Sequence, residues 1–480
     1  MISAKVLIML TILVYLGGMI IIGIYCSKKN ENVGDFYLGG RKLGPFVTAM
    51  SAEASDMSSY LLMGLPGLAY LSGVADVGWT AIGLAIGTYL NWLVVAKKIR
   101  IYTHKLDAIT IPDFFSRRYH DEKNILMCIA AVVIIIFFIP YTASGFAACG
   151  KLFSTLFGVN YIPAMVISAI VIVLYTAMGG FLAASTTDLI QGIVMSIALL
   201  IIVFFGIHIA GGFDAVMDNA RSMTGYLNLT MTHDPVSKTA SPYGFLTICS
   251  TLAWALGYFG MPHILLRFMA IEDHNKLKLS RRIAVIWVVI AMGVAILIGI
   301  IGNAMTKVGA VPLLEGSASE TIIVCVSDLL SKHGCLAAIV AGIVLSGILA
   351  ATMSTADSQL LVSASSVAED IFKGLLKKNA DDKTVMNVSR VTVLVVAVLA
   401  YIIAWNPNNT VMGLVSNAWA GLGAAFGPLV VMSLYWKKTN FPGAVAGIVT
   451  GALAVIIWDY IPLVGGQTLG KATGLYSLVV

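Results

Sequence analysis

Runs of roughly 20 apolar residues recur along the whole chain, and each is long enough to cross about 30 Å of hydrocarbon as a helix. Seven of these runs are uninterrupted, at 6–26, 79–96, 125–139, 190–210, 284–304, 391–405 and 441–458. Five more are shorter or broken by polar, glycine or proline residues, at 45–73, 162–180, 246–266, 336–356 and 411–435. Only 11% of the 480 residues are charged, about half the share of a typical soluble chain. The sequence therefore predicts an all-α polytopic membrane protein with twelve spans.

Lysine and arginine are concentrated in alternate connections between these runs. The rich connections are 27–44, 97–123, 267–282, 373–390 and 437–438, and the poor ones are 211–243, 306–335, 406–410 and 461–472. The positive-inside rule places the rich set in the cytoplasm and the N-terminus outside a plasma membrane. The net charge of +6 follows from this bias, so it implies no nucleic-acid partner. No feature indicates an obligate protein partner.

Two of the interrupted runs carry glycine and proline where a span should be continuous. The first, 45–73, contains the polar stretch 51–59, and the second, 246–266, contains Gly257, Gly260 and Pro262. Backbone groups freed inside a membrane are tolerated only beside other protein or a water-filled cavity. Counted along the chain these are spans two and seven, and each opens a block of five spans with opposite topology. That arrangement is typical of secondary transporters built from inverted repeats.

A third interrupted run, 336–356, supplies further oxygen atoms near its end. Ala351, Ser354 and Thr355 stand at i, i+3 and i+4, so they share one helix face. A carbonyl and two hydroxyls are neutral, hard oxygen ligands of the kind that suit Na⁺ better than transition metals. The alternative is that these hydroxyls bond back to the preceding turn or join neighbouring helices.

Long ordered motifs carry a family resemblance over almost the whole chain. They include FYLGGRKLGPFVTAMSAEASDMSSYLLMGLPG, ITIPDFFSRRY, GGFLAASTTDLIQ, WALGYFGMPHILLRFMA and LAATMSTADSQLLVSASSVAEDIF. The chain resembles the sodium:solute symporter family, and within it the bacterial sodium/proline symporters. The resemblance implies a LeuT-type fold of two inverted five-helix repeats with flanking spans. It divides the single transporter domain 1–480 into the first span and its loop (1–44), repeats at 45–210 and 245–436, and a last part at 437–480. That part would hold span twelve and the start of a truncated or missing thirteenth span.

The resemblance also implies the ligands of the coupling ion. Sodium would be bound by the main-chain oxygens of Ala54, Met57 and Ala351 and by the hydroxyls of Ser354 and Thr355. Asp56 would support the cation-filled break in the second span.

For three further acidic residues, Asp188, Asp357 and Glu53, two roles remain open. Asp188, with Asp357 and Ser358, would form either a second cation position or a cytoplasmic gate. Glu53 is not required by the family's sodium motif, so pairing with a neighbouring base is the alternative to a functional role for it.

A compact, largely aromatic pocket would bind the solute. The residues implied are Ser58, Tyr60, Tyr141, Trp254, Tyr258 and Pro262. Two positions depart from the pattern of proline carriers, because Tyr60 stands where tryptophan is usual and Met261 where glutamine is familiar.

The expected function is secondary active symport, in which inward Na⁺ movement drives uptake of L-proline by alternating access. The alternative is Na⁺-coupled uptake of another small neutral amino acid or a monocarboxylate. No enzyme activity is expected: an intramembrane aspartyl protease would carry its acids in a motif such as GxGD, which this sequence lacks. The setting expected is the plasma membrane of a bacterium.

Overall fold

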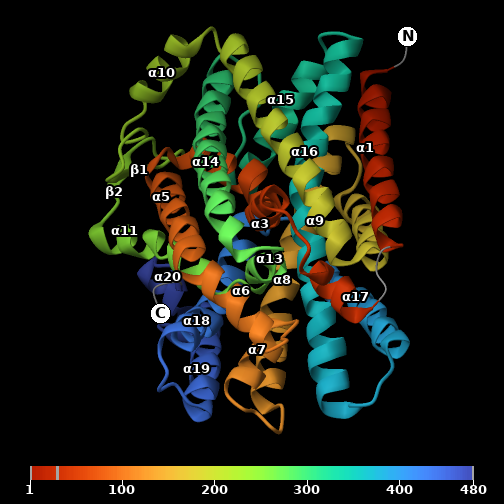
Figure 1. Cartoon of the computed structure of the whole chain (residues 1–480). Coiled ribbons are helices and arrows are strands. Elements are labelled where there is room, and N and C mark those ends of the chain that lie inside the picture. The colour runs from red at the N-terminus through yellow and green to blue at the C-terminus, as the bar shows by residue number, and fades with distance from the viewer. Residues whose placement is uncertain (1–2, 29–31, 478–480) are drawn as a thin grey trace.

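Long helices account for most of the computed structural model, which describes residues 3–28 and 32–477 (Figure 1). Within those residues nine helical segments are long and apolar enough to cross a membrane: Ala4–Cys26, Ala75–Lys105, Ile125–Phe157, Gly180–Ile209, His274–Lys307, Cys335–Leu376, Asp382–Ala404, Val411–Tyr435 and Phe441–Tyr460. They correspond to α1 (Ala4–Ser27), α5 (Ala75–Leu90) with η3 (Asn91–Val95) and α6 (Ala96–Lys105), α8 (Ile125–Phe157), the second part of α9 (Tyr161–Ile209), η5 (His274–Lys276) with α14 (Leu277–Lys307), α16 (Cys335–Ser365) with η7 (Ser366–Leu376), α17 (Asp382–Ala404), α18 (Val411–Tyr435) and α19 (Phe441–Tyr460). All seven uninterrupted runs and two of the interrupted ones fall on these segments.

The other three predicted spans are helical but broken or short. The run 45–73 forms α3 (Pro45–Ser59), η2 (Tyr60–Gly64) and α4 (Leu65–Ser72). The run 246–266 falls on α11 (Phe245–Leu252), α12 (Trp254–Gly257), η4 (Tyr258–Gly260) and α13 (Pro262–Ala270), and its two arms are bent by 46°. The run 162–180 contributes the apolar segment Tyr161–Leu174, and α9 changes direction at Gly180, which has a φ of 64°. All twelve predicted runs are therefore helical, and the glycine and proline positions mark where helices break.

Short elements occupy connections that hydropathy alone leaves as loops. They are α2 (Val33–Leu38), η1 (Gly39–Arg41), α7 (Ile111–Arg118), α10 (Phe213–Ser222), η6 (Gly316–Thr321), α15 (Ile322–Ser331), α20 (Leu469–Thr473), and two antiparallel hairpins, β1 (Met231–His233) with β2 (Ala240–Pro242) and β3 (Pro462–Val464) with β4 (Gln467–Thr468). In the first hairpin Met231 pairs with Pro242 and His233 with Ala240.

Local sequence signals fix where several helices begin. The Thr110 hydroxyl accepts a hydrogen bond of 3.0 Å from the Asp113 amide, and Pro112 lies in the first turn of α7. Asn440 caps α19 in the same way by accepting from the Gly443 amide. Capping side chains satisfy amides that have no partner inside the helix, and proline has no amide to satisfy.

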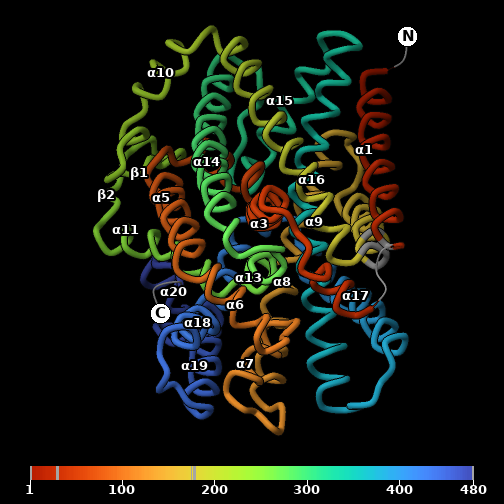
Figure 2. The backbone as a smooth tube through the Cα atoms, viewed as in Figure 1, coloured from red at the N-terminus to blue at the C-terminus, as the bar shows by residue number. Residues whose placement is uncertain are grey.

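The centre of the bundle is formed by helices from both halves of the chain. The long helix α16 packs against α1, α3, α8 and α9, and α3 lies beside α13, as the tube in Figure 2 shows. The two broken spans therefore meet at the core.

Glycine allows the broken seventh span to lie close to α18. A Cβ atom placed on Gly257 would lie 1.9 Å from Nε1 of Trp419, and one on Gly260 would lie 2.3 Å from the Leu422 carbonyl oxygen. The broken seventh span can therefore lie directly against α18 only because both positions lack a side chain.

The outer surface is apolar and the two ends differ. Val14, Phe204, Phe245 and Leu246 are 70% or more exposed, as expected of side chains that face lipid.

The N-terminus lies at the same end of the molecule as α10 and α15, and α7 lies at the opposite end (Figure 1). The connection 97–123, rich in lysine and arginine, thus lies at the opposite end of the molecule from α10 and α15, which belong to connections poor in these residues.

Candidate functional site

The second span is broken at a buried serine. Ser58 has φ 49° and ψ −169° within α3, a conformation that non-glycine residues rarely adopt. Its hydroxyl oxygen accepts a hydrogen bond of 3.1 Å from the Tyr60 amide. Backbone strain of this kind costs on the order of 1–3 kcal/mol and persists only where the surroundings hold it. The break frees backbone oxygens next to Met57 in the middle of the protein.

Helix α16 meets this break through hydroxyl groups. The Ser354 hydroxyl donates to the Ala54 carbonyl oxygen at 2.8 Å and lies 3.2 Å from the Ala351 carbonyl oxygen. The Thr355 hydroxyl also donates to Ala351, at 3.2 Å. All four residues are buried, and Met57 lies one turn beyond Ala54 on α3. These contacts gather carbonyl and hydroxyl oxygens, the ligands that suit a hard cation.

Asp56 connects the break to two other elements. One carboxylate oxygen, Oδ2, accepts a hydrogen bond from the Tyr258 hydroxyl of η4. The main-chain oxygen of Asp56 accepts the Tyr141 hydroxyl of α8 at 3.1 Å. The second carboxylate oxygen, Oδ1, is buried and has no hydrogen-bond partner among the described atoms. A buried acceptor in this state requires an explanation, and a bound cation is one.

Asp188 lies against an arginine that the sequence analysis did not consider. Its Oδ2 accepts the Ser51 hydroxyl at 2.6 Å and Arg267 Nη2 at 3.1 Å. The same nitrogen of Arg267 donates to the Ser358 hydroxyl at 2.5 Å. Arg267 and Asp188 are 1% and 0% exposed, so this is a fully buried ion pair. The guanidinium thus joins α13 to α3, α9 and α16.

Asp357 lies next to this network without an ionic partner at hydrogen-bond distance. Its Oδ1 accepts the Ser358 hydroxyl at 3.1 Å, and its Oδ2 has no partner within the described part of the chain. Asp188, Asp357 and Ser358 are therefore brought together, with Arg267 between Asp188 and Ser358. The sequence analysis counted Arg267 with the basic connection 267–282, but this residue directly follows the run 246–266 and lies in the buried helix α13.

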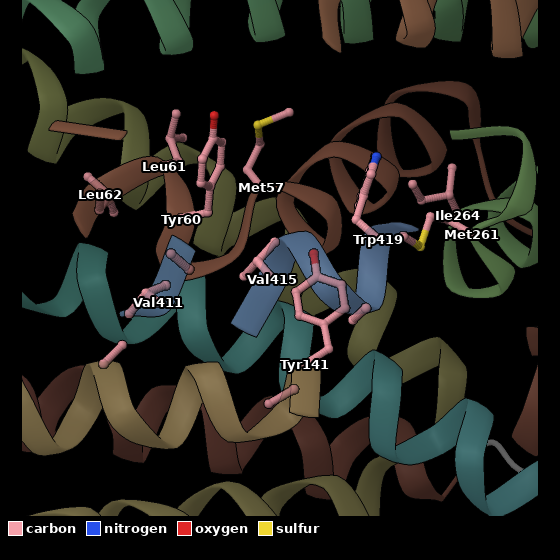
Figure 3. Packing of buried hydrophobic residues seen from close by; sticks show 14 of the residues in the cluster. Met57, Tyr60, Leu61, Leu62, Tyr141, Met261, Ile264, Val411, Val415 and Trp419 are labelled. Carbon is pink, nitrogen blue, oxygen red and sulfur yellow. The ribbon is translucent and has the colours of Figure 1, made fainter. Parts of the chain in front are cut away.

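Three of the predicted solute residues, Tyr60, Trp254 and Tyr258, are linked by ring contacts, in part through Trp419. The rings of Tyr60 and Trp254 stack at 6.1 Å with an interplanar angle of 17°. Tyr258 meets Trp419 edge to face at 5.1 Å, and Pro262 opens α13 directly after the break. Figure 3 shows Tyr60, Tyr141 and Trp419 in the same buried cluster, contributed by three different helices.

Two aromatic members were missed from the sequence. Trp419 donates its indole N–H to the Trp254 carbonyl oxygen at 2.8 Å. Tyr476 places its ring 5.9 Å from that of Trp254 and its hydroxyl 3.3 Å from Asp76 Oδ2. Trp419 lies in an apolar run, where aromatic residues are usual, and nothing in the local sequence of Tyr476 indicates this contact.

Glu53 has no basic partner, so the interpretation as a structural ion pair is wrong for the described residues. Its Oε1 accepts the indole N–H of Trp92 at 3.0 Å. Its Oε2 is buried and has no partner in that part of the protein. Burial of an unpaired carboxylate is costly, so this side chain needs another explanation.

Taken with the fold, this geometry defines a class of protein. Two broken spans that meet at a buried oxygen cluster, within a bundle of apolar helices, characterise a secondary transporter. The sequence profile of the sodium:solute symporter family matches residues 36–451. The chain belongs to that family.

Several named proteins are similar to this chain over nearly its whole length. It is 41% identical to the osmoregulated proline transporter OpuE of Bacillus subtilis, over 97% of this chain and 90% of that protein. It is 43% identical to the sodium/proline symporter of Escherichia coli, over 94% of this chain and 87% of that protein.

Two solved structures share the fold. A Na⁺-coupled sialic acid symporter in a substrate-bound outward-open state has a TM-score of 0.77 at 19% identity, covering 95% of this chain and 92% of that one. A nucleobase-cation-symport-1 family transporter in a closed conformation has a TM-score of 0.52 at 15% identity, covering 88% and 93%. The predicted all-α membrane fold of the LeuT type is confirmed.

The buried pair of Asp188 and Arg267 gives the first prediction. Asp188→Asn or Arg267→Gln alone leaves a buried charge without its partner, which costs about 3–5 kcal/mol. The double variant removes both charges, so its loss of unfolding free energy should be clearly smaller than the sum of the losses in the two single variants. Thermal unfolding of the purified protein in detergent measures this double-mutant cycle.

The exposed pair of Arg221 and Asp218, with side chains 69% and 75% exposed, is the matched control. Asp218→Asn should change the unfolding temperature little, because exposed ion pairs contribute little. Additive losses in the Asp188 and Arg267 cycle would contradict the buried ion pair.

Proposed function

We propose that this protein is a secondary active symporter that couples inward Na⁺ movement to uptake of L-proline by alternating access. The observation that carries the proposal is the 2.8 Å contact between the Ser354 hydroxyl and the Ala54 carbonyl oxygen across the break in α3. It supports a Na⁺ site made of the main-chain oxygens of Ala54, Met57 and Ala351 with the hydroxyls of Ser354 and Thr355. Asp56 adds negative charge beside that site. Two of the similar proteins are a proline transporter and a sodium/proline symporter, which supports proline as the solute.

The orientation we propose follows the positive-inside rule. The N-terminus is extracytoplasmic, together with α10 and α15, and the arginine-rich end that carries α7 faces the cytoplasm of a bacterial cell. The repeats comprise 45–210 and 245–436, each beginning with a broken span. The protein acts as a carrier and not as an enzyme.

The driving force available from one ion is sufficient for useful accumulation. One Na⁺ moving inward gains about 2.3 kcal/mol per 100 mV, and a tenfold sodium gradient adds about 1.4 kcal/mol. Together these support accumulation of a neutral zwitterion by a few hundred-fold, on the order of 10². A carrier of this kind can serve nutrition or osmotic adjustment.

The sodium site is tested by Ser354→Ala and Thr355→Ala. Each removes one cation oxygen, so half-saturating sodium should rise about tenfold or more, and apparent proline affinity should fall because the two ligands are linked. Ser346→Ala is the matched control, since Ser346 is buried on the same helix and, among the described residues, its hydroxyl donates only to the Gly342 carbonyl oxygen. Sodium dependence of labelled proline uptake measures the effect. Wild-type sodium dependence in both variants would exclude this site.

The solute pocket is tested at Trp254 and Tyr60. Trp254→Ala should weaken apparent proline affinity by about tenfold or more, ~1.4 kcal/mol, whereas Tyr60→Trp should preserve or tighten it. Trp405→Ala is the control, because Trp405 is 55% exposed. Competition by unlabelled amino acids measures specificity: lysine, arginine, aspartate and glutamate should fail, because their side-chain charge would be buried unpaired at a cost of several kcal/mol. Unaltered proline affinity in Trp254→Ala would place the pocket elsewhere.

For Asp188, Asp357 and Ser358 we propose a cytoplasmic gate. The guanidinium of Arg267 supports a gate over a second cation position, because it already supplies a positive charge between Asp188 and Ser358. Asp188→Asn and Asp357→Asn should therefore lower turnover while the number of Na⁺ ions moved per proline stays constant. Asp214→Asn, at an exposed position, is the control. Parallel flux measurements with labelled sodium and proline distinguish the two roles, since fewer Na⁺ ions moved per proline in either variant would indicate a second cation position.

A further inference from the structure

A second carboxylate lies on the broken span, outside the ligand set described above. Glu53 and Asp56 stand at i and i+3 on α3, so they share one face of the helix. Their side chains are 1% and 5% exposed. Each carboxylate has one oxygen that accepts a hydrogen bond, from Trp92 and Tyr258 respectively, and one buried oxygen that has no partner in the described structure.

The third span presents further unpartnered oxygens on the helix face that contacts Glu53. Thr88, Asn91 and Trp92 stand at i, i+3 and i+4, and the indole of Trp92 reaches Glu53. Thr88 and Asn91 are fully buried, and Thr88 Oγ1 and Asn91 Oδ1 accept no hydrogen bond from any described residue.

The same face also lies against the seventh span. Asn91 Nδ2 donates to the Tyr258 carbonyl oxygen at 3.0 Å, and a Cβ atom on Gly87 would lie 2.8 Å from Cδ2 of Tyr258. Tyr258 in turn donates its hydroxyl to Asp56. The carboxylates of α3 are therefore linked through Trp92 and Tyr258 to α5, η3 and η4, where the unpartnered oxygens of Thr88 and Asn91 lie.

The charges around the broken spans do not balance. Glu53, Asp56, Asp188 and Asp357 are all buried there, and Arg267 is the one basic side chain at hydrogen-bond distance from any of them in the described bundle. Its guanidinium is bound to Asp188, Ser51 and Ser358.

The remaining ionisable neighbours supply no cation at hydrogen-bond distance. The Tyr258 hydroxyl donates to the Asp56 carboxylate, and the Tyr141 hydroxyl donates to the Asp56 main-chain oxygen. The ring of His263 contacts Phe138 and Tyr141, and neither of its nitrogen atoms has a hydrogen-bond partner among the described residues. One Na⁺ at the site beside Ser354 still leaves two carboxylates without a counter-charge. Buried charges require such compensation.

The unpartnered atoms also indicate the kind of ligand. Glu53 Oε2, Asp56 Oδ1, Thr88 Oγ1 and Asn91 Oδ1 are all oxygens that can accept, and a carboxylate can only accept. A hard cation takes several oxygen ligands at once, so one ion can satisfy several of these acceptors and supply one of the two missing charges.

We propose that Glu53 and Asp56, together with the side-chain oxygens of Thr88 and Asn91, form a second Na⁺ site, distinct from the one at Ala54 and Ser354. The inference rests on the proposed sodium-coupled function and deepens it. Two Na⁺ ions then bind per protein, and Asp56 lies between them.

Equilibrium binding of ²²Na⁺ to the purified full chain, without solute, tests the second site. At saturation the wild type should bind two ions and Glu53→Gln should bind one, whereas Ser354→Ala, which removes one neutral ligand, should bind two with the affinity of one of them weakened about tenfold or more. Glu122→Gln, at an exposed position, is the matched control and should bind two. Thr88→Val, which removes one neutral ligand and no charge, should still bind two ions with the affinity of one of them weakened roughly threefold to tenfold. Thermal unfolding of each variant checks that it is folded.

The outcomes separate this inference from the proposed function. If Glu53→Gln binds as many ions as the wild type and Ser354→Ala binds one of its ions more weakly, the second site is overturned and the symporter proposal stands. If Ser354→Ala binds as the wild type and Glu53→Gln binds one ion fewer, the second site stands and the first was misplaced. If the wild type binds no Na⁺, both fail.

Discussion

A helix that breaks inside a membrane leaves carbonyl and amide groups that lipid cannot satisfy, and the central part of this protein is organised around one such break. At Ser58 the chain turns out of the helical path. The carbonyl oxygen of Ala54 is then met by Ser354 from α16, and that of Asp56 by Tyr141 from α8. Each of these contacts attaches a helix to the weakened span. The requirement to satisfy freed backbone oxygens therefore holds the core together and also concentrates cation ligands there.

The acidic side chains around the break give the site its electrostatic character. One guanidinium, that of Arg267, contacts side chains from three other helices: Ser51 of α3, Asp188 of α9 and Ser358 of α16. If these groups form the proposed cytoplasmic gate, a movement that opens it has to separate them or carry them together. A Na⁺ ion at the proposed site beside Ser354 would add positive charge to the same region, so ion occupancy and helix arrangement would be coupled through electrostatics. This is the physical basis we propose for alternating access.

Much of the architecture could be predicted because hydropathy and helix breakers are local signals. The uninterrupted run at 125–139 lies on α8, and the glycines and proline of 246–266 mark the bend between α11 and α13. Elements outside the apolar runs were missed, such as α10 and the hairpin of β1 and β2, because their short polar sequences carry no hydropathy signal.

The site was predicted less completely, since its partners are far apart in the sequence. Arg267 lies 79 residues from Asp188, and Tyr476 lies 400 residues from Asp76. The residues expected at the sodium position were suggested by family motifs and by the helical spacing of Ala351, Ser354 and Thr355. No spacing rule indicates that Trp92 contacts Glu53, because that contact depends on how the third span packs.

The central claim is that sodium entering at the break drives solute accumulation, and flux into proteoliposomes measures it most directly. Purified protein is reconstituted, the membrane potential is clamped with a potassium ionophore, and labelled proline uptake is compared under an inward gradient of sodium or of choline. We predict accumulation above the external concentration with the sodium gradient, abolished by a sodium ionophore. Equal accumulation with choline, or accumulation that survives the ionophore, would contradict the account.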